Sequence, residues 1–102
     1  MGKYYITNKA AADLANVWDG HVGRGGTAEN ANRLIAELLE SFQTLADFPD
    51  LGTKRDYLQV GILAMPNDKH MIFYSKSSGG VDILQVLFGG MDFQAYFSAS
   101  EE

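Results

Sequence analysis

The chain contains no cysteine, which excludes a disulfide framework and thiolate chemistry. Its two histidines, His21 and His70, are far apart in the sequence, and two histidines without cysteine do not make a familiar structural zinc site. We therefore predict neither a metal nor a cofactor. The lack of cysteine also fits a reducing cytoplasm.

Positive charge is scarce. Only 8 lysines and arginines stand against 13 aspartates and glutamates, giving a formal net charge of -5. Proteins that bind nucleic acids neutralise phosphates with lysine and arginine, so this balance argues against direct nucleic-acid binding. Only Lys54 and Arg55 are adjacent, within the segment "FPDLGTKRDYLQVG".

Long hydrophobic runs are also missing, because no apolar stretch approaches the roughly 18 residues of a membrane span. The N-terminal segment lacks a signal-peptide core, since its apolar stretch is short and is interrupted at residues 7–9. A chain of 102 residues is large enough for one hydrophobic core. We predict a single cytoplasmic domain, 1–102, with a frayed tail at 98–102.

The first half of the chain shows a strand followed by helical periodicity. Residues 3–6 form a short aromatic and β-branched run typical of a strand. Thr7 and Thr27 are suitable N-caps, and apolar residues follow each at helical spacing. The pattern predicts an antiparallel helical hairpin, whose first helix ends near the glycine-rich stretch 19–26 and whose second runs from about 28 to 47.

The helical periodicity predicts which aromatic and acidic side chains are buried and which are exposed. Trp18 and Phe42 lie on the apolar stripes, so we expect both in the core rather than on a ligand platform. The carboxylates fall on the opposite faces, and we expect them all to be solvated: Asp13, Asp19, Glu29, Glu37 and Glu40.

After Pro49 the pattern becomes alternating, and it predicts three strands at 57–63, 70–76 and 81–87. The last two are expected to form a hairpin. In the final strand we expect Val81, Ile83 and Gln85 on one face and Asp82, Leu84 and Val86 on the other. Apolar residues on both faces predict a central strand that is covered on both sides. The fold class is therefore α+β, with an N-terminal strand and a helical hairpin packed on a small antiparallel sheet.

The residues alone leave an enzyme and a binding module open. A metal-free ribonuclease needs a base, an acid and cations that stabilise the charge on the phosphorus. The suitable side chains are His70, Tyr74, Tyr96 and Arg55, and their spacing does not show that they converge.

Two early segments, "TNKAAADLANVW" and "FQTLADFPDLGTKRDYL", carry recognisable motifs. They are similar to motifs of the ParE branch of the RelE/ParE toxin superfamily, the toxins of type II toxin–antitoxin modules. "TNKAAADLANVW" resembles the opening "S-P-x-A-x-x-D-L-x-x-I-W" of that branch. "FQTLADFPDLGTKRDYL" resembles its "F-x-x-L-A-x-F-P-x-L-G-x-x-R-x-x-L". The matching positions include Ala10, Asp13, Leu14, Trp18, Phe42, Pro49, Gly52, Arg55 and Leu58.

Two later segments extend the resemblance over nearly the whole chain. "HMIFY" is similar to "Y-x-I-F-Y", and "VDILQVLFGGMD" is similar to "V-x-I-x-R-V-L-H-G-x-R-D". This chain departs from the family at five positions that are commonly arginine or histidine there: Leu63, Ser75, Gln85, Phe88 and Met91. The departures weaken an RNA-cleaving activity most, because that activity leans on several cations and a base.

The resemblance implies a toxin that inhibits DNA gyrase and is neutralised by a ParD-like antitoxin. Arg55 keeps the family's cation, so the resemblance assigns target contact to Arg55 and, with less support, to Lys54. The antitoxin of this family lies across a hydrophobic groove of the toxin, and the expected contacts here are Phe88, Met91, Phe93 and Phe97.

Two alternatives stay open. One is a RelE-like, ribosome-dependent mRNA endonuclease that uses His70 or Tyr96 together with Arg55. The other is a decayed member of the superfamily that keeps antitoxin binding but has lost its toxicity.

Overall fold

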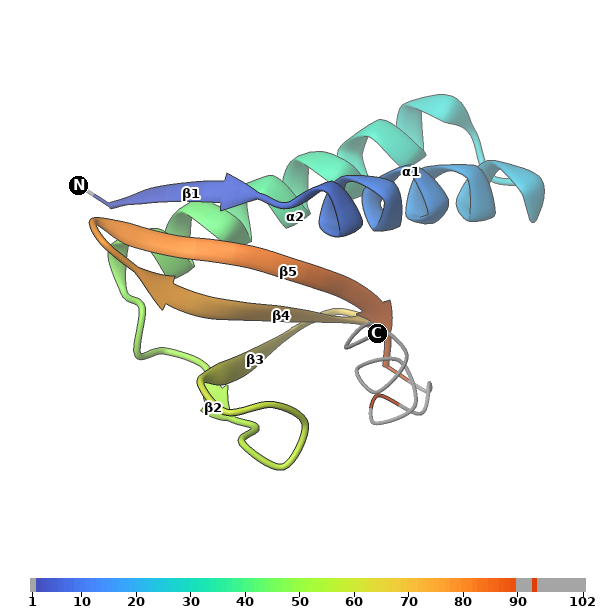
Figure 1. Cartoon of the computed structure of the whole chain (residues 1–102). Helices are drawn as coiled ribbons and strands as arrows, with labels where there is room; N and C mark the ends of the chain where they lie inside the picture. Colours follow the sequence, from blue (N-terminus) through green and yellow to red (C-terminus); the bar gives the residue numbers. More distant parts are fainter. Residues whose placement is uncertain (1, 90–92, 94–102) are drawn as a thin grey trace.

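The computed structural model describes residues 2–89 and residue 93. It confirms an α+β fold in which an N-terminal strand precedes a helical hairpin (Figure 1). The two helices lie along one face of the sheet (Figure 1). In chain order the elements are β1 (Lys3–Ile6), α1 (Asn8–Gly23), α2 (Ala28–Asp47), β2 (Thr53–Lys54), β3 (Ile62–Asn67), β4 (His70–Ser77) and β5 (Gly80–Phe88).

The strands form one sheet in the order β1-β5-β4-β3-β2. All neighbouring pairs are antiparallel except β1 and β5, which are parallel, with Lys3 opposite Gly80 and Ile6 opposite Ile83. The sheet is therefore mixed rather than purely antiparallel. A parallel pair needs a long crossover connection, and here almost the whole chain lies between the two strands.

The threonine caps predicted for both helices are confirmed. Thr7 Oγ1 accepts the backbone N–H of Ala10 at 3.2 Å, and Thr27 Oγ1 accepts that of Asn30 at 3.1 Å. Each bond satisfies one of the N–H groups that the first turn of a helix leaves unpaired.

Apolar side chains cover both faces of the sheet, as predicted for β5, which is an inner strand between β1 and β4. The larger cluster lies between the helices and the sheet and includes Leu38, Phe42, Leu45, Tyr74 and Ile83. The smaller cluster, which we call the second core, consists of Leu58, Ile62, Ala64, Phe73 and Leu87, with Met71, Leu84 and Phe93 packed against it.

The predicted strand at 57–63 is wrong, because residues 56–61 form a turn and the strand occupies Ile62–Asn67. The Leu58 N–H donates to the Arg55 carbonyl at 2.9 Å, and Gly61 adopts a φ of 87° that favours glycine. The strand also contains Pro66. Because β2 pairs only with Leu63 and Ala64, Pro66 lies beyond the paired part of that edge, where its missing N–H costs no ladder bond.

A β-bulge changes the predicted facing of β5. Phe73 lies opposite Gln85 and Tyr74 opposite Ile83, so Leu84 is the extra residue. The alternation shifts by one residue after the bulge. Val86, rather than Gln85, therefore joins Ile83 in the larger cluster.

Phe42 is fully buried, as predicted, and its ring meets that of Tyr4 edge to face with centroids 5.7 Å apart. Trp18 is only half-buried, so its prediction as a core residue is wrong. Its indole Nε1–H donates to Asn32 Oδ1 at 2.9 Å, which links the two helices near the surface.

The prediction that all five helix carboxylates are solvated is wrong for Asp13. Its side chain is buried, its Oδ2 accepts the Val86 N–H at 3.0 Å, and its Oδ1 pairs with the Lys9 ammonium. The other four carboxylates are exposed. Asp13 therefore joins α1 to β5, and this anchored helix places the C-terminal end of α1 over the end of the sheet.

Candidate functional site

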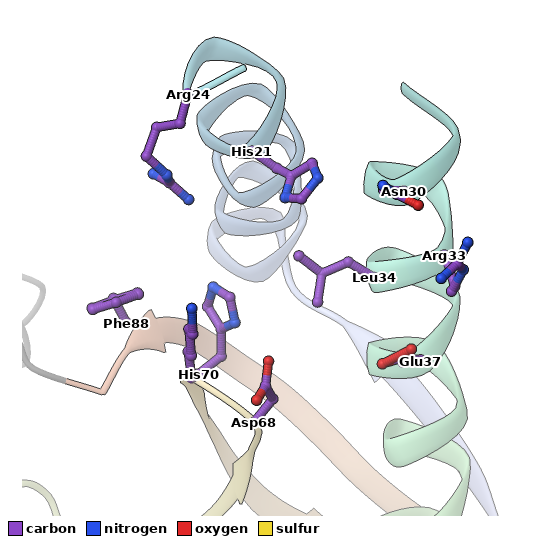
Figure 2. A pocket seen from close by; sticks show the side chains of 10 residues that line it. His21, Arg24, Asn30, Arg33, Leu34, Glu37, Asp68, His70 and Phe88 are labelled. Atoms are coloured by element: carbon purple, nitrogen blue, oxygen red, sulfur yellow. The ribbon is translucent and has the colours of Figure 1, made fainter. Parts of the chain in front are cut away.

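A cleft of about 340 Å³ opens where the α1–α2 connection faces the turn between β3 and β4 (Figure 2). We call it the hairpin-end cleft. Its lining comes from the end of α1, from α2, from the β3–β4 turn and from the end of β5: His21, Arg24, Asn30, Arg33, Leu34, Glu37, Asp68, Lys69, His70 and Phe88.

A groove of about 560 Å³ adjoins this cleft and lies between α1 and the end of β5. We call it the α1–β5 groove. Its apolar lining comes from Val17, Leu34, Val86, Leu87 and Phe88. The cleft and the groove share five residues: Arg24, Leu34, Lys69, His70 and Phe88.

His70 lies at this junction, where it begins β4. Its ring meets that of Phe88 edge to face, with centroids 5.8 Å apart. Burial lowers the pKa of His70 below its usual value of 6.5; Asp68 opposes this shift, while Arg24 and Lys69 add to it. Within residues 2–89 and 93, the buried Nδ1 atom has no hydrogen-bond partner.

Arg24 caps the C-terminal end of α1, and its side chain lies back along the helix. A Cβ atom added at Gly20 would be 3.3 Å from Arg24 Nη1, so the bare glycine leaves room for the guanidinium. In Figure 2 the Arg24 side chain points from α1 toward the end of β5, whereas Arg33 points away from the cleft. Arg24 therefore presents its charge to the junction and Arg33 does not.

The glycine-rich connection between the helices is shaped around His21. A Cβ added at Gly26 would be 2.3 Å from the Cδ2 and Nε2 atoms of His21, a distance that real structures do not allow. The Gly26 N–H also donates to the His21 carbonyl at 3.0 Å. At Gly26, the glycine allows close packing against this ring.

The second predicted site, Lys54 and Arg55, lies at the other end of the β3–β4 hairpin. Lys54 is exposed in β2, and Arg55 follows it at the start of the turn, half-buried. The Arg55 N–H donates to the Ile62 carbonyl at 2.8 Å. Asp56 does not pair with Arg55 among the described residues; its Oδ1 accepts the Gly61 N–H at 3.1 Å.

The segment before this site is held by Tyr74. Its hydroxyl donates to the Pro49 carbonyl at 2.9 Å and accepts the Gly52 N–H at 2.8 Å. A Cβ at Gly52 would be 2.5 Å from the same oxygen. Burial is the main cause that raises the pKa of Tyr74 above 10.0. Tyr74 is thus fully used in holding the backbone, and its hydroxyl is not free for acid–base chemistry.

The structure does not bring together the described parts of the hypothetical nuclease site. His70 pairs with Asn67 at one end of β3, and Arg55 contacts Ile62 at the other. At about 3.3 Å per residue these ends are roughly 17 Å apart. Tyr96, the third predicted member, lies outside the described residues.

The predicted antitoxin contacts fall into two groups. Phe88 is 46% exposed at the end of β5. Phe93 is half-buried against the second core, where its ring meets that of Phe73 edge to face with centroids 4.9 Å apart. Met91 and Phe97 lie outside the described residues, as does the tail at 98–102.

Arg24, Lys69 and the groove are features that the sequence reasoning missed. The lining residues come from four separate elements, and no local spacing links them.

Among the described residues, no group of three or more histidine or acidic side chains is arranged to hold a metal. Neither described helix is long and apolar enough to cross a membrane.

Comparisons with known proteins show what this chain is similar to. The family model for the ParE toxin of the type II toxin–antitoxin system parDE matches residues 4–93. The chain is 28% identical over 96 residues to Toxin ParE1 of Caulobacter vibrioides, covering 94% of this chain and 98% of that protein. A solved structure of the chromosomal ParDE toxin–antitoxin system from P. aeruginosa has the same fold, with a TM-score of 0.73 and 22% identity over 86% of this chain and 96% of that one.

Proposed function

The chain belongs to the ParE toxin family of type II toxin–antitoxin systems, and from that premise we propose that it inhibits DNA gyrase and is neutralised by a cognate ParD-like antitoxin. Gyrase acts on DNA inside the cell, so the proposal also places the protein in the cytoplasm. The observation that supports it best is the presence of two different exposed surfaces at opposite ends of the β3–β4 hairpin.

The first surface is suited to an antitoxin. The α1–β5 groove has an apolar floor, and Phe88 stands exposed at its end. Exposed aromatic side chains at the end of an apolar groove are typical of sites that take an amphipathic segment of a partner. We assign antitoxin contact to this groove and to Phe88. Antitoxin contact through Met91, Phe93 and Phe97 stays a prediction.

The second surface is suited to the target. Lys54 is exposed, and the turn that follows Arg55 carries Tyr57, which is 62% exposed, and Val60, which is 87% exposed. An arginine beside exposed aromatic and aliphatic groups is a common composition for the centre of a protein interface. We assign gyrase contact to Arg55, with Lys54 beside it.

An experiment in bacterial cells separates the two assignments. Controlled expression of the wild-type chain should stop growth, and co-expression of the small open reading frame beside its gene should restore it. Arg55→Ala should permit growth without the antitoxin. Phe88→Ala should stay toxic but lose rescue. Lys3→Ala should behave like wild type, because Lys3 is an exposed cation that does not line the groove and lies in β1, at the opposite edge of the sheet from β2.

Two outcomes would count against the proposal. Arg55→Ala that still stops growth would remove Arg55 from the target surface. Growth arrest accompanied by codon-specific mRNA cuts, abolished by His70→Ala or Tyr96→Phe, would support the RelE-like nuclease instead.

A further inference from the structure

We propose that Arg24, Lys69 and His70 form a binding site for an oxyanion, a phosphate or a carboxylate group, at the junction of the hairpin-end cleft and the α1–β5 groove. The proposed site consists of residues of this chain alone, so anion binding can be tested without gyrase or an antitoxin.

The first argument is the placement of charge in an acidic protein. The chain has a net charge of -5, yet Arg24 and Lys69 line both the cleft and the groove. The carboxylates Glu37 and Asp68 line the cleft alone. Within the described part of the chain Arg24 and Lys69 form no ion pair, whereas Lys9 and Lys76 are both paired. Unpaired cations that line a concave surface raise the local concentration of anions.

The second argument is the way in which Arg24 is held. Gly20 leaves space for the guanidinium, and Figure 2 shows the side chain directed toward the end of β5, where His70 and Phe88 lie. A guanidinium presents paired donors that match two oxygens of a carboxylate or phosphate. Lys69 adds a second charge at the same junction.

The third argument is the state of His70. Its imidazole is partly buried beside two cations, and its Nδ1 atom has no partner among residues 2–89 and 93. Burial and both cations favour the neutral ring, and only Asp68 favours the charged one. A bound anion would offset the cations and supply an acceptor, so it would favour the charged imidazole.

Other ligand classes fit less well. Carboxylates are too few at the junction for a metal, since among the described side chains no group of three potential ligands occurs. A nucleic-acid strand needs cations along an extended path. The chain offers only 8 lysines and arginines in total, and at the shared junction only Arg24 and Lys69. A single oxyanion group matches the two cations at this junction.

The test follows the imidazole proton signals of His70 by NMR while inorganic phosphate is added to the purified chain. We expect saturable shifts and a rise in the pKa of His70 when phosphate is bound. Arg24→Gln and Lys69→Gln should each weaken binding about tenfold, which is the usual effect of losing one charge-assisted hydrogen bond. Arg33→Gln is the matched control, because it removes a cation from the same lining whose side chain points away (Figure 2).

A parallel titration with acetate identifies the source of the anion. Saturation by acetate as well as phosphate would support a site for acidic side chains, and saturation by phosphate alone would support a phosphate site. Absence of saturable binding by either ion would overturn the proposal. Equal weakening by Arg33→Gln and Arg24→Gln would also overturn it, because that result indicates general electrostatic attraction. Thermal melts of each variant confirm that the compared proteins are folded.

Discussion

The carboxylate of Asp13 in α1 accepts the backbone N–H of Val86 in β5 at 3.0 Å. Strand β1 covers this edge of β5 only as far as Ile83. Beyond that point α1 and its N-cap replace β1. The Thr7 hydroxyl shares its single hydrogen between the carbonyls of Ile83 and Leu84, at 2.8 and 3.2 Å, and the Asp13 carboxylate accepts the Val86 N–H. Helix side chains thus complete an edge that the sheet leaves open.

Asp13→Ala should lower the free energy of unfolding by about 1–3 kcal/mol, because it leaves a buried N–H without an acceptor. Asp13→Asn keeps an acceptor oxygen and should cost less. Asp19→Ala is the control, since Asp19 is exposed on the same helix. The measurement is equilibrium unfolding in urea. If Asp13→Ala were as stable as Asp19→Ala, the bond to Val86 would not hold the helix on the sheet.

Tyr74→Phe should also cost about 1–3 kcal/mol, because the Pro49 carbonyl and the Gly52 N–H lose their shared partner. Tyr57→Phe is the matched control, since Tyr57 is exposed. The pKa of Tyr74 is raised above 10.0, so the wild type should lose stability as the pH rises above about 10 and the unfolded chain ionises first. That loss should be smaller in Tyr74→Phe; equal alkaline loss in both proteins would contradict the role of the hydroxyl.

His70 should make the protein less stable in mild acid. Its pKa is lowered from 6.5, mainly by burial, so the unfolded chain binds this proton more tightly than the folded one. The contribution of the neutral His70 ring to the free energy of unfolding is fully present above about pH 6.5. It is lost as the pH falls through the lower pKa of His70 in the folded state. His70→Gln should flatten this part of a stability curve measured between about pH 5 and about pH 8. Parallel curves for the two proteins would show that His70 is not the responsible group.

Gly26→Ala should destabilise the connection between the helices by about 1–3 kcal/mol, because its Cβ would overlap the His21 ring. Gly23→Ala is the control: it is the last residue of α1, and a Cβ there would meet nothing within 4 Å. Alanine favours helix more than glycine does, so Gly23→Ala should be neutral or stabilising by up to about 1 kcal/mol. The measurement is the melting temperature of both variants. A higher melting temperature for Gly26→Ala than for Gly23→Ala would contradict this interpretation.

Both helices could be predicted from the sequence because their signals are local. Thr7 and Thr27 cap them, and the apolar stripe of α2 continues to its end at Asp47. The alternating residues at 57–63 predict a strand, whereas residues 56–61 form a turn. The φ of Gly61 and the Leu58–Arg55 bond are what end the extended chain there.

The parts that sequence could not supply depend on distant contacts. In the sequence, Asp13 has the spacing of a surface carboxylate. Its hydrogen-bond partner Val86 is 73 residues away in the chain and meets it only in the folded structure. The bulge at Leu84 moves the side chains after it to the opposite faces of the sheet, and no residue type in the sequence predicts its position. Arg24, Lys69 and His70 meet only when the end of α1 is placed over the β3–β4 turn.

The most direct test of the central claim is a DNA supercoiling assay with purified gyrase, the purified chain and its antitoxin. The account predicts that the wild-type chain inhibits supercoiling, that Arg55→Ala does not, and that prior addition of the antitoxin restores gyrase activity. A folded wild-type chain that binds the antitoxin yet leaves supercoiling unchanged at a large molar excess over gyrase would contradict the claim and favour a member that has lost its toxicity.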